Sequence, residues 1–261
     1  MLSLSNLIAQ SWVLYTKNFW TYLKLSFFIF LVTIPAAAIS SLSYAFFASK
    51  IANLSLNILI NLLVFFLTIL VTIVLVRVAD KQLKSLGSGE VVLLSLSREF
   101  ENSLKLWPMV LVVSIIVGLI QLIGLFFLII PGIIFSVWFA FALCYVILEF
   151  PSSGSVSTAI KESLKQSREL VRGRFWGVLL RIFVPTILWS LFGWAVSMIF
   201  VNSLNIIQKY FLVGAAESVT RLLDILKILG STYINALFIP LFVITTVILF
   251  RSLESAKTEK I

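Results

Sequence analysis

Residues 109–148 read MVLVVSIIVGLIQLIGLFFLIIPGIIFSVWFAFALCYVIL and contain no charged side chain. A helix rises about 1.5 Å per residue, and roughly 20 residues cross the hydrocarbon core of a bilayer. These 40 residues therefore predict two spanning helices. Pro131 and Gly132 predict the turn of a tight hairpin between them, because proline ends the incoming helix and glycine tolerates unusual backbone angles.

The composition extends this interpretation to the whole chain. Of 261 residues, 61% are hydrophobic and only 12% are charged, with a mean hydropathy of +1.11. A soluble domain normally has about a quarter of its residues charged. We therefore expect one integral membrane domain over residues 1–261. The first apolar run starts only near Leu23 and continues past a weak cleavage-like site, so it is interpreted as a mature span and not as a signal peptide.

The predicted fold class is all-α: a multi-pass bundle of about six spanning helices in three hairpins, with amphipathic interfacial helices on the cytoplasmic side. The predicted spans lie near 23–47, 52–76, 107–130, 132–149, 175–201 and 232–250. Polar and apolar residues alternate at helical spacing in three further segments, near 3–18, 90–105 and 155–174. Each of these segments precedes an odd-numbered span. At the entry to span five, Gly173 and Gly177 favour a flexible elbow over a close-packing motif.

Two of the amphipathic segments share a sequence pattern, which suggests an internal repeat. The aligned positions are Ser11, Leu14 and Trp20 in the first copy and Ser167, Leu170, Gly173 and Trp176 in the third. A degenerate middle copy contains Ser97, Phe100 and Ser103, and reaches Trp107 only with one extra residue. The alternative is that interfacial tryptophans and capping serines recur by chance.

Positive charge predicts the orientation of the chain. Sixteen of the 20 Lys and Arg residues fall on one side of the predicted spans, and the other four are Lys50, Lys209, Arg221 and Lys227. The positive-inside rule then places both termini in the cytoplasm. The expected location of the protein is the cytoplasmic (inner) cell membrane. Residues 203–230 lie on the opposite side. The sequence leaves three structures open for them: a surface helix, an extension of span five or a shallow re-entry.

The residue types present exclude most familiar chemistry. The chain contains no histidine, so a Ser-His triad and histidine metal ligands are excluded, and we expect no catalytic residue, metal or cofactor. The single cysteine, Cys144, lies in an apolar run and is expected to be a small buried hydrophobe. A membrane enzyme that uses Glu149 ranks lowest, because this carboxylate has no visible catalytic partner.

Two polar features of the spans are candidate sites. Asn53, Asn57, Asn61, Thr68 and Thr72 form a stripe along span two, which favours hydrogen bonds between helices over a solute pathway. Glu149 at the end of span four and Arg181 early in span five are candidates for an ion pair that orients two helices, or for one that gates or binds a polar head group.

The stretch from about Leu106 to Val184 resembles a known family. Its features are the apolar run that ends Ile-Ile-Pro131-Gly132, the span that ends in Glu149, and the Ser167 to Trp176 pattern. They resemble the membrane domain found beside glycerophosphoryl diester phosphodiesterases, and related six-helix bacterial membrane proteins. The resemblance implies a bacterial membrane protein without the separate catalytic barrel. The basic residue usual in span four of that group is replaced here by Trp138 and Phe139.

These observations favour a non-catalytic membrane protein that organises lipid, or a partner protein, through its cytoplasmic helices and basic face. The expected partners are membrane lipids, anionic ones in particular, with a protein partner as a further option and no nucleic acid. The alternative function is a transporter or permease-like carrier of a lipid or small amphiphile, with the span-two stripe lining its path.

Overall fold

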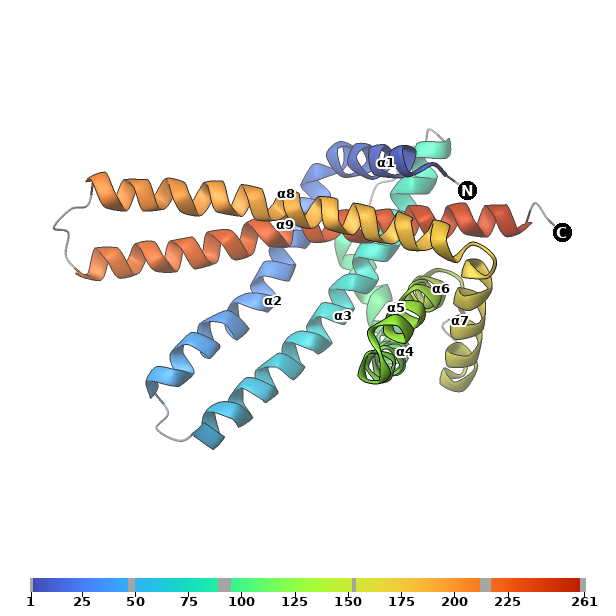
Figure 1. The fold of residues 1–261 in the computed structure, drawn as a ribbon, viewed down its shortest axis with the longest axis horizontal. Coiled ribbons are helices and arrows are strands. Elements are labelled where there is room, and N and C mark those ends of the chain that lie inside the picture. The colour runs from blue at the N-terminus through green and yellow to red at the C-terminus, as the bar shows by residue number, and fades with distance from the viewer. Residues whose placement is uncertain (1, 47–49, 89–94, 152–153, 212–216, 259–261) are drawn as a thin grey trace. The chain divides into compact units, whose positions relative to one another are not determined.

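The computed structural model describes residues 2–46, 50–88, 95–151, 154–211 and 217–258, and the side chains of 2–34, 54–87, 95–151, 154–210 and 219–257. Within these ranges every regular element is a helix, which confirms the predicted all-α class (Figure 1). The helices are α1 (Leu4–Lys17), α2 (Phe19–Phe46), α3 (Lys50–Ser88), α4 (Leu96–Phe127), α5 (Ile129–Trp138), α6 (Ala142–Leu148), α7 (Val156–Val171), α8 (Phe175–Phe211) and α9 (Glu217–Thr258).

Five of the described helical segments are long and apolar enough to cross a membrane: Leu54–Gly87, Leu96–Phe127, Ile129–Leu148, Phe175–Tyr210 and Val219–Lys257. The predicted span near 23–47 falls in α2, whose described apolar part, Phe19–Ile34, is shorter. The result agrees with a membrane-spanning bundle of about six helices.

The surface of the α4–α5 hairpin shows how strongly the chain favours lipid. The five consecutive apolar residues from Phe126 to Ile130 are each between 66% and 87% exposed. Monomeric soluble proteins rarely leave a contiguous apolar surface of this kind in water. A hydrocarbon environment removes that cost, because lipid tails are as apolar as these side chains.

The chain divides into two compact units that alternate along the sequence. One unit contains Met1–Lys17, Ile69–Pro185 and Val243–Ile261, and the other contains Asn18–Thr68 and Thr186–Phe242. Three long helices, α3, α8 and α9, contribute residues to both units. The prediction of a single membrane domain stays a prediction.

The core of the first unit forms around the second half of α3 and the last part of α9. Four consecutive residues in each helix are buried, Ile73–Val76 in α3 and Val247–Phe250 in α9. A helix that is apolar on all sides is stable only when other helices surround it. Helix α1 packs here through buried Leu7 and Leu14, and Thr245 of α9 donates a hydrogen bond to its Ser11 (3.0 Å).

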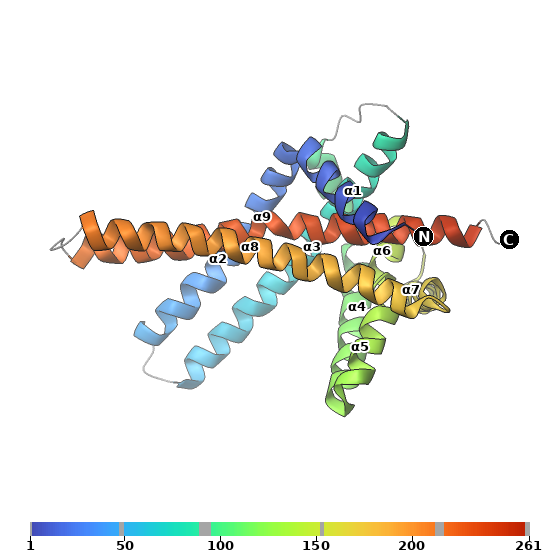
Figure 2. The same ribbon diagram turned by 45° about the horizontal axis from the view of Figure 1, so that its top comes forward.

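In the second unit, the parts of α8 and α9 that belong to it lie side by side (Figures 1 and 2). The rings of Phe192 and Phe238 meet edge to face at 5.5 Å, and Lys227 donates to Gln208 at 2.5 Å. Phe30 of α2 contacts Tyr233 of α9 in the same edge-to-face geometry, with ring centroids 5.1 Å apart. These contacts place aromatic rings between the helices.

The turn of the central hairpin differs from its predicted position. Helix α4 ends at Phe127, and the extended residue Leu128 (φ −173°, ψ 151°) separates it from α5, so Pro131 and Gly132 lie inside α5 and not at the turn. Proline is accepted there because the first-turn N–H groups of a helix have no partner inside the helix. Gly132 instead permits close packing: a Cβ on it would lie 3.0 Å from the backbone nitrogen of Leu125.

The middle amphipathic segment is not a separate helix. Residues 90–94 of the predicted helix at 90–105 lie outside the described residues, and residues 96–105 belong to α4, which continues through Pro108 to Phe127. The buried residues Glu99, Ser103, Leu106, Val110, Val113 and Val117 recur at helical spacing. One buried face therefore continues from the amphipathic part into the apolar part, and no change of direction is needed.

Residues 203–230 extend two spans. Helix α8 continues to Phe211 and α9 begins at Glu217, with 212–216 outside the described residues. At about 1.5 Å per residue, the 37 residues of α8 measure roughly 55 Å, well beyond a hydrocarbon core of about 30 Å. Within the described part, residues 203–211 therefore extend span five as one alternative predicted, whereas residues 217–230 belong to the helix of span six.

The close approach of α4 and α5 generates a prediction with an internal control. A Cβ on Gly124 would lie 2.6 Å from Phe135 Cδ2, whereas one on Gly118 of the same helix would meet nothing within 4 Å. We expect Gly124→Ala to destabilise the protein by about 1–3 kcal/mol through overpacking, and Gly118→Ala to be neutral or slightly stabilising. Thermal unfolding in detergent measures the difference, and equal melting temperatures would contradict the packing described.

Candidate functional site

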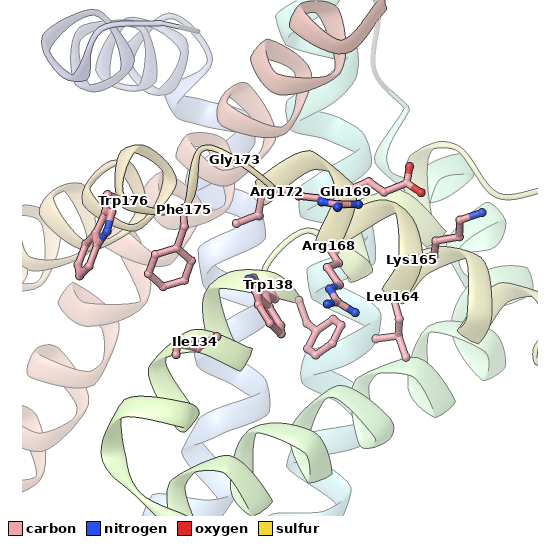
Figure 3. Close-up of a pocket in the computed structure, with 12 residues that line it drawn as sticks. Ile134, Trp138, Leu164, Lys165, Arg168, Glu169, Arg172, Gly173, Phe175 and Trp176 are labelled. Atoms are coloured by element: carbon pink, nitrogen blue, oxygen red, sulfur yellow. The ribbon is translucent and has the colours of Figure 1, made fainter.

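A groove of the first unit lies between the end of α5, the polar face of α7 and the start of α8 (Figure 3). Its volume is about 940 Å³. The lining residues are Ile134, Trp138, Phe139, Leu164, Lys165, Arg168, Glu169, Val171, Arg172, Gly173, Phe175 and Trp176. The groove thus combines an aromatic and aliphatic wall with four charged side chains.

Positive charge dominates the polar part of the groove. The guanidinium carbon of Arg168 lies 4.7 Å from the centroid of the Trp138 ring, a cation–π contact that holds the side chain in the groove. Among the described residues, no carboxylate forms an ion pair with Lys165, Arg168 or Arg172. Because they form no such ion pair, these cations are available to an anionic ligand. Arginine pairs well with carboxylates and phosphates.

The one carboxylate of the groove, Glu169, already has a partner. Lys257 of α9 donates a hydrogen bond to it at 2.9 Å and a second one to Gln166 at 2.8 Å. The hydrogen bond from Lys257 lowers the pKa of the Glu169 carboxyl, and the charges of Lys165 and Arg172 act in the same direction. Glu169 therefore stays ionised at neutral pH and bound to the end of α9.

A glycine elbow sets the angle between the groove's two helical walls. Helix α7 ends at Val171 and α8 begins at Phe175, and between them Gly173 has φ +76°, the left-handed region that favours glycine. The sequence pattern predicted an elbow at this position. The backbone N–H of Arg174 donates to Val171 O at 2.9 Å and closes the turn.

On the other side of the groove, Ser167 links α7 to the end of α5. Its hydroxyl donates to Trp138 O at 2.7 Å and accepts from the backbone N–H of Phe141 at 3.2 Å. These two backbone groups lie where the predicted fourth span is interrupted, between α5 and α6. The buried serine therefore satisfies the carbonyl and the amide that the interruption releases.

The outer copies of the predicted repeat place equivalent residues in similar surroundings. Ser11 and Ser167 are fully buried, Leu14 and Leu170 are buried, and Trp20 and Trp176 are each 73% exposed. In the middle segment, Ser103 and Leu106 have the same spacing and are also buried, whereas the sequence alignment had used Ser97 and Phe100. The repeat itself stays a prediction.

The predicted pair of Glu149 and Arg181 is replaced by different contacts. Glu149, the C-terminal cap of α6, accepts from Arg251 Nη1 at 2.5 Å. Arg181 donates through Nε to Leu2 O at 2.7 Å and through Nη1 to Gly177 O at 3.0 Å. The amino-terminal segment and the start of α8 thus satisfy Arg181, and the last helix of the chain satisfies Glu149.

Arg251 is the centre of an ion-pair network that the sequence analysis missed. Its Nε donates to Asp80 Oδ1 at 2.6 Å, and its Nη1 also donates to Glu254 Oε2 at 2.6 Å. Lys84 lies 2.8 Å from the other oxygen of Asp80. A second cluster joins buried Glu99 of α4 to Arg77 and Lys81 of α3. The network links α3, α6 and α9, and each cation has an acid, which indicates a structural role.

One sequence signal could have identified these residues. Asp80 and Glu99 flank apolar segments in a chain with only 11 acidic residues, and a carboxylate in such a position requires a partner. The partner could not be named, because Asp80 and Arg251 are 171 positions apart.

The polar stripe of span two does not line the groove. Asn61 Nδ2 donates to Asn57 O at 2.7 Å and Thr68 Oγ1 donates to Val64 O at 2.7 Å, so both side chains bond to the backbone of their own helix. Thr72 is half-buried on α3, and the side chain of Asn53 lies outside the described residues. The stripe's role as helix-pairing residues or as a solute path stays a prediction.

Within the described ranges, no group of three or more Cys, Asp or Glu residues is placed to hold a metal ion, and Cys144 is buried. Comparisons with protein-family models, curated proteins and solved structures found no match. The resemblance to the membrane domain found beside glycerophosphoryl diester phosphodiesterases therefore stays a prediction, and the chemistry of the site has to be argued from its own residues.

The ion-pair network makes a stability prediction. Arg251→Gln leaves the buried carboxylate of Asp80 without its guanidinium partner, and we expect a loss of about 3 kcal/mol and a lower melting temperature. The control is Lys257→Gln, which breaks the half-exposed pair with Glu169 and should cost less than about 1 kcal/mol. Similar melting temperatures for the two variants in detergent would show that the network contributes little.

Proposed function

We propose that this protein is a non-catalytic membrane protein that binds and organises anionic lipid at the cytoplasmic face of the membrane. The observation that supports the proposal is the groove beside α7, in which Lys165, Arg168 and Arg172 have no carboxylate partner among the described residues and lie next to an aromatic wall. This combination fits a ligand with an anionic head and apolar chains.

Helix α7 packs differently from what its amphipathic sequence pattern indicates. The buried face of α7 contains Ala159, Ser163, Ser167, Leu170 and Val171, and Ser167 bonds to the backbone at the α5–α6 interruption. That face is already covered by protein and is not available for insertion into lipid. The exposed cationic face of α7 is the part that remains for a lipid head group.

The preference for anionic lipid can be measured directly. In nanodiscs that contain a mixture of phosphatidylglycerol and phosphatidylcholine, we expect the purified protein to retain phosphatidylglycerol preferentially. Added phosphatidylglycerol should raise the melting temperature of the detergent-solubilised protein, because a ligand that binds only the folded state stabilises it. The effect should weaken at high salt. Equal retention of the two lipids would contradict the proposed function.

The orientation that the proposal requires is testable by cysteine labelling. Cys144 is buried, so cysteines introduced by Ser3→Cys, Ser255→Cys and Asn205→Cys, all at exposed positions, are expected to be the reactive thiols. In right-side-out cells, a membrane-impermeant maleimide should label only the Asn205→Cys variant. Labelling of either terminal variant would place that terminus, and the groove's orientation with it, in doubt.

A further inference from the structure

We propose that the groove between α5 and the α7–α8 elbow is a specific site for one anionic glycerophospholipid, whose phosphate is bound by Arg168 and Arg172. This inference rests on the proposed function and goes beyond it, because it assigns the lipid to one place and one pair of residues. The volume of about 940 Å³ is large enough for a head group, its glycerol and the first part of the acyl chains.

Arg168 and Arg172 both line the groove at the end of α7. Arg168 and Arg172 are four residues apart, which places them on one face of the same helical stretch. The backbone N–H of Arg172 donates to Arg168 O at 2.9 Å, so the two positions are held in register. A phosphate can accept several hydrogen bonds from each guanidinium group, and such charge-assisted bonds are among the strongest available to a protein.

Trp138 fixes the direction of the guanidinium that would meet the phosphate. Figure 3 shows the Arg168 side chain extending from α7 toward the Trp138 ring, with Phe175 and Trp176 toward the other side of that ring. No described residue accepts a hydrogen bond from the Arg168 guanidinium, so its N–H groups remain available to a ligand. The cation–π contact holds Arg168 in place before a ligand arrives, which reduces the entropy lost on binding.

The surroundings of the arginines favour a lipid over a free anion. Trp176 is 73% exposed on α8, and Ile133, which precedes the lining residue Ile134 on α5, is 43% exposed. Apolar surface is therefore exposed on both helices beside the groove. Both helices belong to segments long and apolar enough to cross a membrane. A soluble phosphate would leave that surface in contact with water, whereas acyl chains would cover it. Tryptophan is also the residue enriched where head groups meet hydrocarbon.

The frame of the site is independent of the residues that would bind the lipid. The Gly173 elbow and the hydrogen bonds of Ser167 set the positions of α7 and α8 relative to α5. Arg168 and Arg172 are exposed on this frame, and no ion pair of the described residues includes them. Replacing the two arginines is therefore expected to change binding without unfolding the protein.

The decisive experiment compares two double variants with the same change of charge. Arg168→Gln with Arg172→Gln removes the proposed phosphate ligands. Arg98→Gln with Lys161→Gln removes two exposed cations that do not line the groove. Native mass spectrometry of protein titrated with phosphatidylglycerol should show one tightly retained lipid in the wild type and in the control. Retention by the groove variant should be weaker by about tenfold or more.

The outcomes separate the site from the function. If the wild type prefers phosphatidylglycerol and the groove variant retains it equally well, the site is overturned and the proposed function stands. If the wild type shows no preference, both are contradicted. Displacement of the lipid by excess inorganic phosphate would show that the groove recognises a free anion, which would overturn the assignment to a lipid.

A second measurement keeps the test informative if the groove variant is unstable. Phosphatidylglycerol with brominated acyl chains quenches nearby tryptophans, and at one lipid per protein in detergent only a bound lipid acts as a quencher. We expect Trp176→Phe to remove a large part of the quenching, and Trp194→Phe, an exposed tryptophan that does not line the groove, to leave it unchanged. Equal quenching in the two variants would overturn the site.

Discussion

Inside hydrocarbon, each backbone N–H and C=O needs a partner within the protein, because no water is present to replace it. A long uninterrupted helix meets this requirement by itself, and most of the described chain does so. One exception is residues 139–141, where α5 stops before α6 begins. Ser167 supplies the partners for Trp138 O and Phe141 N, so α7 has to pack against the interruption. The groove forms where this packing brings the cationic face of α7 beside the aromatic end of α5.

The same requirement governs the charged groups. Asp80 and Glu99 are almost fully buried, and leaving either without a partner would cost several kcal/mol. Arg251 binds Asp80, Glu149 and Glu254, and thereby joins the last helix to α3 and to the end of α6. Glu149 benefits in particular, because a carboxylate at a helix C-terminus is repelled by the partial negative charge of the helix end. These paired charges fix helix positions. The cations of the groove form no ion pair with a described carboxylate, so they are available to bind an anionic ligand.

Amphipathic sequence has two physical meanings in a membrane protein, and α7 illustrates both. Its small and apolar residues contact other helices, while its cations remain exposed. The separation of apolar and polar residues onto two faces does not by itself distinguish a helix that inserts into lipid from one that packs on protein. In α7 the distinction comes from Ser167, whose fully buried hydroxyl bonds to Trp138 O and Phe141 N, partners outside its own helix that lipid tails do not offer.

The sequence by itself determined the helical class, the membrane-spanning character and the position of the Gly173 elbow. These follow from local properties: the length of apolar runs, the scarcity of charge and the backbone freedom of glycine. Each long helix contains one of the predicted apolar runs, but α3, α4, α8 and α9 continue well beyond the predicted bounds, because a helix does not have to end where an apolar run ends. The sequence misplaced the central turn by three residues, since Pro131 is as acceptable in the first turn of a helix as in a loop.

Only the tertiary structure decided which distant residues meet. Arg251 binds Asp80 and Glu149 instead of leaving Glu149 to Arg181, and this choice depends on the end of α9 lying close to both α3 and the end of α6. The groove is assembled from α5, α7 and α8 in the same way, so its cations could be listed from the sequence but not grouped. The physical reason is that periodicity reports the face on which a residue lies, whereas a binding site depends on which faces come together.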